Sequence, residues 1–199
     1  QDEYRATLKS FYGALKTMDG CIRFALLTGV TKFGKVSVFS DLNNLKDISM
    51  DERYTNICGI TQNEIETGLK PYVEQFSLKN NIKEDEALEE LRTNYDGYHF
   101  CENTEGIYNP FSLLNALDSL KLGSYWFETG TPSYLVKLLQ QHDYNIERMS
   151  KEETEADVLN SIDSSSTNPI PVIYQSGYLT IKEYNPKYGI YTLGFPNRE

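Results

Sequence analysis

The chain has 199 residues and a formal net charge of −10 at neutral pH, which excludes a broad nucleic-acid surface because phosphates require a basic stripe. Hydrophobic residues make up 39% of the chain, enough to build a core, so global disorder is also excluded. The three cysteines are odd in number and far apart, and with only two histidines they form no disulfide framework and no metal site with zinc spacing.

The sequence contains no apolar run of membrane-spanning length and no series typical of a signal peptide. We therefore expect a cytoplasmic location without a membrane partner. In that compartment Cys21, Cys58 and Cys101 are expected to be reduced thiols.

Apolar residues at helical spacing predict an amphipathic helix over residues 3–17, ended by Asp19-Gly20. Residues 22–28 follow and are continuously apolar apart from Arg23, which is typical of a strand covered on both faces, as in a parallel sheet. No second run of this kind occurs, and a buried strand needs partners for its backbone groups. We expect those partners outside this chain and interpret the chain as a piece of a longer protein.

The stretch TGVTKFGKVS, residues 28–37, contains the G-x-x-x-x-G-K pattern of a phosphate-binding loop. That pattern requires Ser or Thr after the lysine as a magnesium ligand, whereas this chain has Val36. The β-branched residues that follow are poor helix formers, and no later apolar strand ends in Asp or Glu. The stretch is therefore not the phosphate cradle. Lys32 and Lys35 form a local basic spot; the alternative is two solvated loop lysines.

Helix signals dominate the middle of the chain. A capping box from Thr61 to Glu64 starts a helix that Pro71 kinks or ends. A second helix is expected near residues 83–95, with an acidic face toward solvent. The expected buried residues of the two helices are Ile65, Leu69, Val73, Phe76, Leu88, Leu91 and Tyr95.

Asp96-Gly97 is a turn signal that begins a short strand in YDGYHF. Asp96 and His99 could suggest acid–base chemistry, but no nucleophile accompanies them in a known arrangement, so a structural role is favoured. Three further helix starts are then expected, marked by Asn109-Pro110, by Thr131-Pro132 and by a capping box from Ser150 to Glu153.

The C-terminal region predicts a short helix and then a hairpin, with strands YLTIKEY and YGIYTL around Asn185-Pro186-Lys187. Helices followed by such a wing are typical of winged-helix modules, which bind DNA or proteins. The hairpin carries two lysines, Lys182 and Lys187, and one glutamate, Glu183. This is too little positive charge to prefer DNA.

Several motifs, in order, closely resemble the bacterial AAA-ATPase-like family: FYGALK, FALLTGVTKFGKVSVFSDLNNL, ERYTNICGIT, YDGYHF, YNPFSLLNAL, YWFETGTPSYLV, QSGYLTIKEY and LGFPN. The resemblance covers nearly all of the chain, and many family members carry a C-terminal nuclease-like domain of the PD-(D/E)XK type. In the family the P-loop and the magnesium-binding acidic strand precede FYGALK, and the nuclease-like domain follows LGFPN; none of these is present here. Asp2-Glu3-Tyr4 is similar to the end of the acidic strand, but no apolar strand precedes it, so that role is not assigned.

The resemblance implies an α+β fold, mostly helical. Residues 1–60 would be the C-terminal part of an ATPase core with one sensor-type strand, and residues 61–199 a helical lid with a winged-helix-like hairpin. Thr28, at the end of that strand, is the first candidate for sensor 1, which helps to hold the γ-phosphate and the attacking water, and Thr31 is the next. A threonine that merely caps a strand is the alternative.

Arg53 in DERYTN is a further candidate, supplying positive charge to phosphate as an arginine finger does. A surface ion pair with Asp51 or Glu52 is the alternative.

Two functions stay open. In the first, this part of an ATPase couples ATP state to the attached nuclease-like domain, without binding ATP by itself. ATP, magnesium and nucleic acid would then belong to the intact parent, and the missing N-terminal core and the nuclease-like domain are the expected partners. In the second, the winged region is a binding module for protein or nucleic acid with no ATPase role. A G-x-x-x-x-G-K-[ST] sequence upstream would favour the first.

Overall fold

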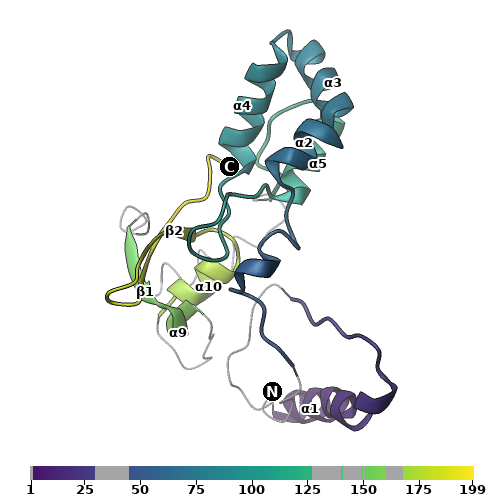
Figure 1. Ribbon diagram of the computed structural model, residues 1–199, viewed down its shortest axis with the longest axis vertical. Coiled ribbons are helices and arrows are strands. Elements are labelled where there is room, and N and C mark those ends of the chain that lie inside the picture. The colour runs from purple at the N-terminus through teal and green to yellow at the C-terminus, as the bar shows by residue number, and fades with distance from the viewer. Residues whose placement is uncertain (1, 30–44, 127–139, 141–148, 150, 160–167) are drawn as a thin grey trace.

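The computed structural model describes residues 2–29, 45–126, 140, 149, 151–159 and 168–199, and their fold is α+β, as expected. The described residues contain one three-stranded antiparallel sheet of strand order β1-β3-β2, with short helices beside it, a group of longer helices at one end of the molecule and the N-terminal helix at the other (Figure 1). Two separate clusters of buried apolar residues form, one among helices and one on the sheet. The division of the chain into residues 1–60 and 61–199 remains a prediction.

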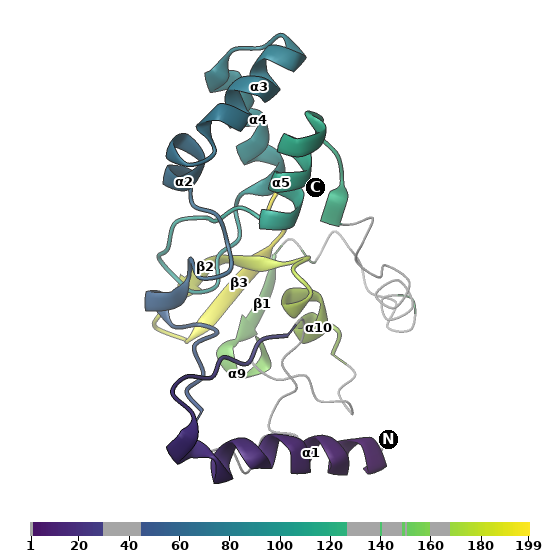
Figure 2. The ribbon, with the colours of Figure 1, turned by 90° about the vertical axis from the view of Figure 1, so that its right-hand side faces the viewer.

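The N-terminal part consists of α1 (Asp2–Thr17), the short 3-10 helix η1 (Asp19–Cys21) and an extended segment up to residue 29. The helix prediction is confirmed, but its apolar face is exposed: Tyr4 is 78% and Phe11 66% accessible. Figures 1 and 2 show α1 at the end of the molecule opposite α2–α5.

The strand predicted over residues 22–28, with partners outside this chain, remains a prediction. The segment is extended but joins no β-ladder with any described residue, and Phe24 is 81% exposed. A strand requires a neighbour for its amides and carbonyls, and the described part of the chain supplies none.

Residues 60–126, here called the helical unit, contain α2 (Gln62–Thr67), α3 (Lys70–Asn80), α4 (Glu84–Tyr95) and α5 (Pro110–Ser119). The capping box is confirmed, because the Thr61 amide donates to Glu64 Oε2 at 2.8 Å and the Glu64 amide donates to Thr61 Oγ1 at 3.3 Å. Pro71 separates two helices, since α2 ends at Gly68 and the proline occupies the first turn of α3.

The core of the helical unit is mostly apolar, although Ser77 and Ser112 are also buried. Its buried members are Ile65, Val73, Phe76, Ala87, Leu91, Tyr95, Tyr108, Leu113, Ala116 and Leu117, with Leu69 and Leu88 partly buried against them. Asn81 takes the left-handed conformation at φ 55° that ends α3 and turns the chain into α4.

The region between α4 and α5 differs in part from the prediction. YDGYHF forms no strand; only isolated bridges occur, between Tyr98 and Ile107 and between Ile60 and Tyr108. The N-cap at Asn109 is confirmed, because its side chain accepts from the amide of Phe111 at 2.9 Å.

The sheet unit, residues 151–159 and 168–194, contains β1 (Glu152–Glu155), α9 (Ala156–Leu159), α10 (Ile170–Gln175), β2 (Thr180–Asn185) and β3 (Ile190–Gly194). The short helix and the hairpin are confirmed, with a register shift between Ile181 and Glu183. Its buried residues are Leu159, Ile170, Ile173, Leu179, Ile181, Tyr191 and Leu193, and Met149, which precedes the unit, joins the same core.

The capping box predicted from Ser150 to Glu153 is wrong, because Glu152–Glu155 is a strand that pairs antiparallel with β3. Backbone pairing with β3 outweighs the low strand propensity of glutamate. The helix expected after Thr131-Pro132 lies largely outside the described residues, as do Thr31, Lys32 and Lys35. No helix in the described ranges is long and apolar enough to cross a bilayer.

Candidate functional site

Thr28 is the one sensor candidate that the structure describes. It lies near the end of the extended apolar segment and is exposed, as is Gly29 after it. The sequence places Thr28 directly before the GVTKFGK loop, so any phosphate contact of Thr28 depends on residues beyond those described here.

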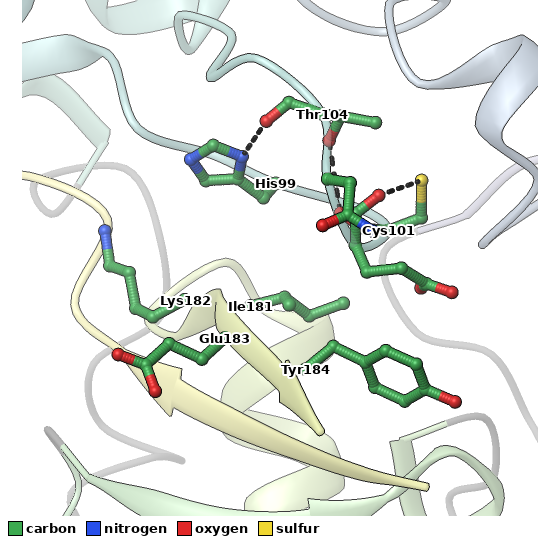
Figure 3. Close-up of a pocket in the computed structure, with 9 residues that line it drawn as sticks. His99, Cys101, Thr104, Ile181, Lys182, Glu183 and Tyr184 are labelled. Carbon is green, nitrogen blue, oxygen red and sulfur yellow. Dashed lines mark hydrogen bonds between the residues drawn. The ribbon is translucent and has the colours of Figure 1, made fainter. Parts of the chain in front are cut away.

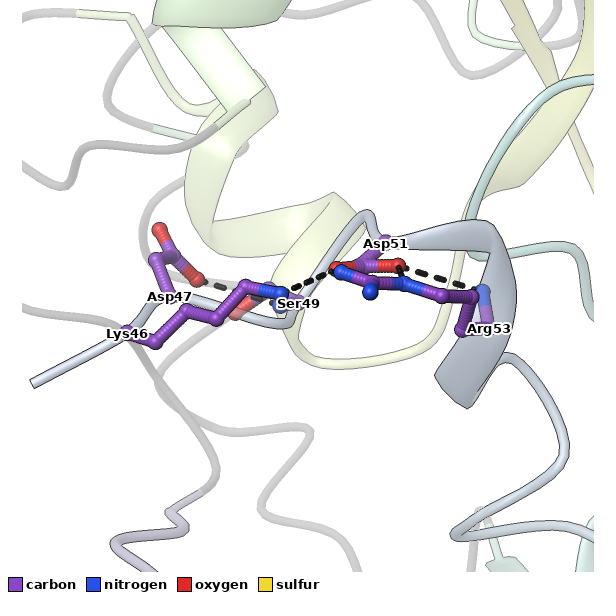
Figure 4. Close-up of polar contacts among 5 residues, drawn as sticks. All are labelled: Lys46, Asp47, Ser49, Asp51 and Arg53. Carbon is purple, nitrogen blue, oxygen red and sulfur yellow. Dashed lines mark hydrogen bonds and ion pairs between the residues drawn. The ribbon is translucent and has the colours of Figure 1, made fainter.

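Arg53 lies on the short 3-10 helix η2 (Glu52–Tyr54), whose N-cap is Asp51. The two side chains form a forked ion pair: Arg53 Nε donates to Asp51 Oδ1 at 2.8 Å and Nη2 donates to Oδ2 at 2.6 Å (Figure 4). Lys46 Nζ lies 3.0 Å from the same Oδ2. The contact between Arg53 and Asp51 is the surface ion pair that the sequence offered as an alternative to an arginine finger.

The two cations strongly stabilise the ionised carboxylate. The hydrogen bond from Arg53, followed by that from Lys46, holds the pKa of Asp51 far below its usual range, while Asp51 raises the pKa of Arg53. The Arg53 side chain is nevertheless 68% exposed, against 18% for Asp51. A guanidinium has five donors, so Arg53 can still offer N–H groups to an anion while it keeps Asp51.

Tyr54 adds an aromatic surface to this cluster. Lys46 Nζ and the Arg53 guanidinium each lie 5.7 Å from the centroid of its ring, and Tyr54 is 38% exposed. We call Lys46, Asp51, Arg53 and Tyr54 the η2 cluster. Sequence reasoning missed Lys46 and Tyr54, although Lys-x4-Asp-x-Arg-Tyr is present in the chain. The η2 cluster itself has two cations and one carboxylate, but Asp47 and Glu52 in the same segment make the local charge negative.

A small cleft of about 180 Å³ lies between the loop after Tyr98 and strand β2 (Figure 3). Its walls are His99, residues 101–104 and residues 181–184. His99 Nδ1 lies 2.9 Å from the carbonyl oxygen of Thr104, and burial raises the pKa of the Cys101 thiol. A histidine bound to a backbone carbonyl and a thiol held protonated do not make a nucleophile–base pair.

The contacts of Asp96 also hold the backbone in place. It caps the end of α4, with its amide donating to the carbonyl of Arg92, and its Oδ2 lies 3.6 Å from Arg92 Nε. These contacts agree with the structural role favoured by the sequence for Asp96 and His99.

The side chains that could bind a metal are dispersed over the described part of the chain. The described residues contain no group of three or more His, Cys, Asp or Glu side chains arranged to hold a metal. Cys21 and Cys58 are exposed free thiols and Cys101 is a buried one. Of the residues considered for phosphate, the structure describes Thr28 and Arg53 and shows no hydrogen bond between them.

Comparison with known proteins gives two matches. Residues 1–39 match the model of a family described as "Predicted AAA-ATPase". The chain is 35% identical over 202 residues to an "Uncharacterized protein in vnfD 5'region" of Azotobacter chroococcum mcd 1, an alignment that covers 99% of this chain and 36% of that protein. The chain therefore spans little more than a third of this relative's length. No solved structure matches.

Proposed function

We propose that this chain is the sensor-strand and lid part of a P-loop ATPase whose phosphate loop and acidic strand belong to a longer protein. The observation that carries the proposal is the extended segment at residues 22–28, which is apolar, exposed and outside any ladder of the described chain. The segment lies inside the part that matches the ATPase family model, residues 1–39.

Insertion of this segment into a sheet would bury its exposed apolar side chains and would also pair its backbone amides and carbonyls. Phe24, Leu26 and Leu27 are 81%, 53% and 42% exposed. Full burial of such a side chain from full exposure is worth about 1.5–3 kcal/mol, so the two leucines, already half buried, would gain only part of that amount. A central position in a parallel sheet also pairs the backbone on both sides. The exposed apolar face of α1 supports the same interpretation, because a helix on a sheet buries one stripe.

The position of Thr28 then supports a role at the nucleotide. In open α/β sheets, ligands bind beyond the carboxyl ends of the strands, and Thr28 is the last residue of the proposed strand. Its hydroxyl would orient the γ-phosphate or the attacking water, with Thr31 as the second candidate. ATP and magnesium would be bound mainly by residues of the longer protein.

The rest of the chain would act as a lid that couples nucleotide state to a further domain, for which the resemblance suggests a nuclease-like domain. The sheet unit supports this part of the proposal: β1 is followed by α9, α10 and a hairpin whose second strand pairs with β1. One strand, two helices and a returning hairpin are the connectivity of winged-helix modules.

A binding module without an ATPase role is the competing function. The observation that favours it is the tip of the hairpin, where Tyr188 is 63% exposed and Lys187 Nζ lies 5.0 Å above its ring. An exposed aromatic next to a cation suits a nucleic-acid base or an acidic peptide. The net charge of −10 favours protein over nucleic acid.

Calorimetry with magnesium-ATP distinguishes the two functions. The proposal expects micromolar binding to the longer protein and none to residues 1–199 alone. It also expects that Val36→Thr, which completes the P-loop pattern in residues 29–36, creates no binding in the 199-residue chain. Micromolar binding to that chain, with or without the substitution, or no binding to the longer protein, would contradict the proposal.

A further inference from the structure

The helical unit and the sheet unit are joined by polar contacts. Each has its own apolar cluster, and hydrogen bonds connect them at two places. At the first, the amide of His99 donates to Thr180 Oγ1 at 2.7 Å, and this hydroxyl donates to the carbonyl of His99 at 3.0 Å. On the same loop, Tyr191 Oη of β3 donates to Glu102 Oε2 at 3.0 Å. We call these contacts of residues 99–102 with the sheet unit the pivot. A joint made of hydrogen bonds permits relative motion more readily than a shared core does.

The second place is a strap, residues 195–199, that leaves β3 and crosses onto the helical unit. Asn197 Nδ2 donates to the carbonyl of Asp96 at 2.9 Å, and the amide of Arg198 donates to the carbonyl of Thr93 at 3.2 Å. On the other side, Lys182 Nζ of β2 donates to the carbonyl of Pro196 at 3.2 Å. The strap therefore bonds to both units, and Figure 2 shows its end beside α5.

Glu199 fastens the strap to α5. Its Oε1 accepts from Ser112 Oγ at 2.8 Å and from the amide of Trp126 at 2.7 Å. Ser112 lies in the first turn of α5, where the helix dipole favours a negative charge. The ring of Trp126 lies against Gly177 of the sheet unit, at the same joint: a Cβ added to Gly177 would lie 3.8 Å from the indole nitrogen.

The closed joint leaves polar groups without partners. Among the described residues, the buried side-chain atoms without a hydrogen bond are Asp96 Oδ1, Tyr178 Oη and Glu199 Oε2, and all three residues belong to this joint or adjoin it. A buried polar atom without a partner costs free energy that contact with water would return. Release of the strap would expose these groups to solvent, and it breaks the strap's bonds to Asp96, Thr93, Ser112 and Trp126.

From these contacts we infer that the strap is a releasable latch: the sheet unit swings about the pivot when the strap leaves the helical unit, and both units stay folded. The use of this motion in nucleotide coupling rests on the proposed function. The latch itself does not, because it can be tested on the 199-residue chain without nucleotide. Failure of ATP binding in the longer protein would leave the result of that test unaffected.

The chain provides its own probe, since Trp126 is its single tryptophan. The double variant Lys182→Met, Asn197→Ala removes two bonds of the strap and leaves Trp126 and Glu199 in place. We expect acrylamide quenching of Trp126 to rise by roughly twofold or more, as for a locally opened segment, with unchanged far-ultraviolet circular dichroism. Lys187→Met is the matched control, because Lys187 contacts Tyr188 at the hairpin tip; its quenching should equal that of the wild type.

Hydrogen exchange of the wild-type chain gives a second test that needs no variant. The amides of Trp126 and Arg198, at the latch, should exchange at least about tenfold faster than those of Leu91 and Leu193, in the two cores. Equal exchange at all four amides would show one cooperative unit and overturn the latch. Unchanged Trp126 quenching in a folded double variant would overturn it as well.

Discussion

Asp51 and Arg53 form a two-point ion pair, with N–O distances of 2.8 and 2.6 Å, on a turn where Lys46 approaches the same carboxylate at 3.0 Å. The pair orients the guanidinium and fixes the start of η2, since Asp51 Oδ1 also accepts from the amide of Arg53 at 3.2 Å. An arginine finger would need to direct its free N–H groups to phosphate while it keeps this contact.

The ion pair predicts an unusually acidic Asp51. Because its folded-state pKa lies below the unfolded value of about 3.9, its contribution to stability is complete above that value and is lost only as the pH falls through the lower, folded pKa. A carboxyl carbon NMR titration should find Asp51 ionised below the usual aspartate range. Arg53→Gln should return the pKa toward that range; titration of Asp51 at an ordinary pH in the wild type would contradict the observed geometry.

Thr61→Ala tests the capping box of α2. The change removes the hydroxyl that accepts from the Glu64 amide, and loss of such a cap costs about 1 kcal/mol of unfolding free energy. Thr67→Ala is the matched control, because Thr67 Oγ1 donates to the carbonyl of Asn63 inside the helix and alanine is the better helix former. Urea unfolding should separate the two variants, and equal midpoints would argue against the cap.

Leucine-to-alanine changes test the two apolar cores. Leu91 and Leu193 are both 0% exposed, one in each core, whereas Leu78 is 81% exposed. Leu91→Ala and Leu193→Ala should each lower the unfolding free energy by about 2–5 kcal/mol, while Leu78→Ala should change it by less than about 0.5 kcal/mol. Thermal unfolding measures all three, and a large effect of Leu78→Ala would mean that this face is covered in solution.

Gly97 and Gly189 offer a matched pair of glycine positions. Both have positive φ, 96° and 67°, but a Cβ on Gly97 would collide with the carbonyl of Pro196, whereas nothing lies within 4 Å of one on Gly189. Gly189→Ala should therefore cost only the backbone strain, about 1 kcal/mol, and Gly97→Ala clearly more. Similar unfolding midpoints would indicate that the strap does not pack on Gly97 in solution.

Local signals in the sequence predicted much of this fold. Thr61 with Glu64, and Asn109 with Pro110, mark helix starts because the bonds that they make are close in sequence. The strand at Glu152–Glu155 could not be found this way, because its partner Leu193 lies far along the chain. The bond of Asn197 to Asp96 spans 101 residues and has no local signature.

The sequence likewise predicted only those parts of the candidate site that depend on residues close together in the chain. The sequence named Asp51 as an alternative partner of Arg53, two positions away, but Lys46 and Tyr54 join them only through the path of the backbone before η2. The apolar run that ends at Thr28 has the composition of a buried strand. A strand forms only beside neighbouring strands, however, and the described residues do not contain them. The role of Thr28 remains a prediction.

Thr28 is proposed to end a strand beside ATP, and Thr28→Val in the longer protein is the most direct test, because valine keeps the shape and removes only the hydroxyl. Thr17→Val, on α1, is the matched control. ATPase turnover and nucleotide affinity should be measured on the same preparations. We expect Thr28→Val to lower turnover by roughly tenfold to a thousandfold with nearly unchanged affinity, as for a donor used mainly in the transition state, and Thr17→Val to change neither. Unchanged turnover in Thr28→Val, with only a shift in melting temperature, would contradict the account and leave Thr28 as a residue that caps a strand.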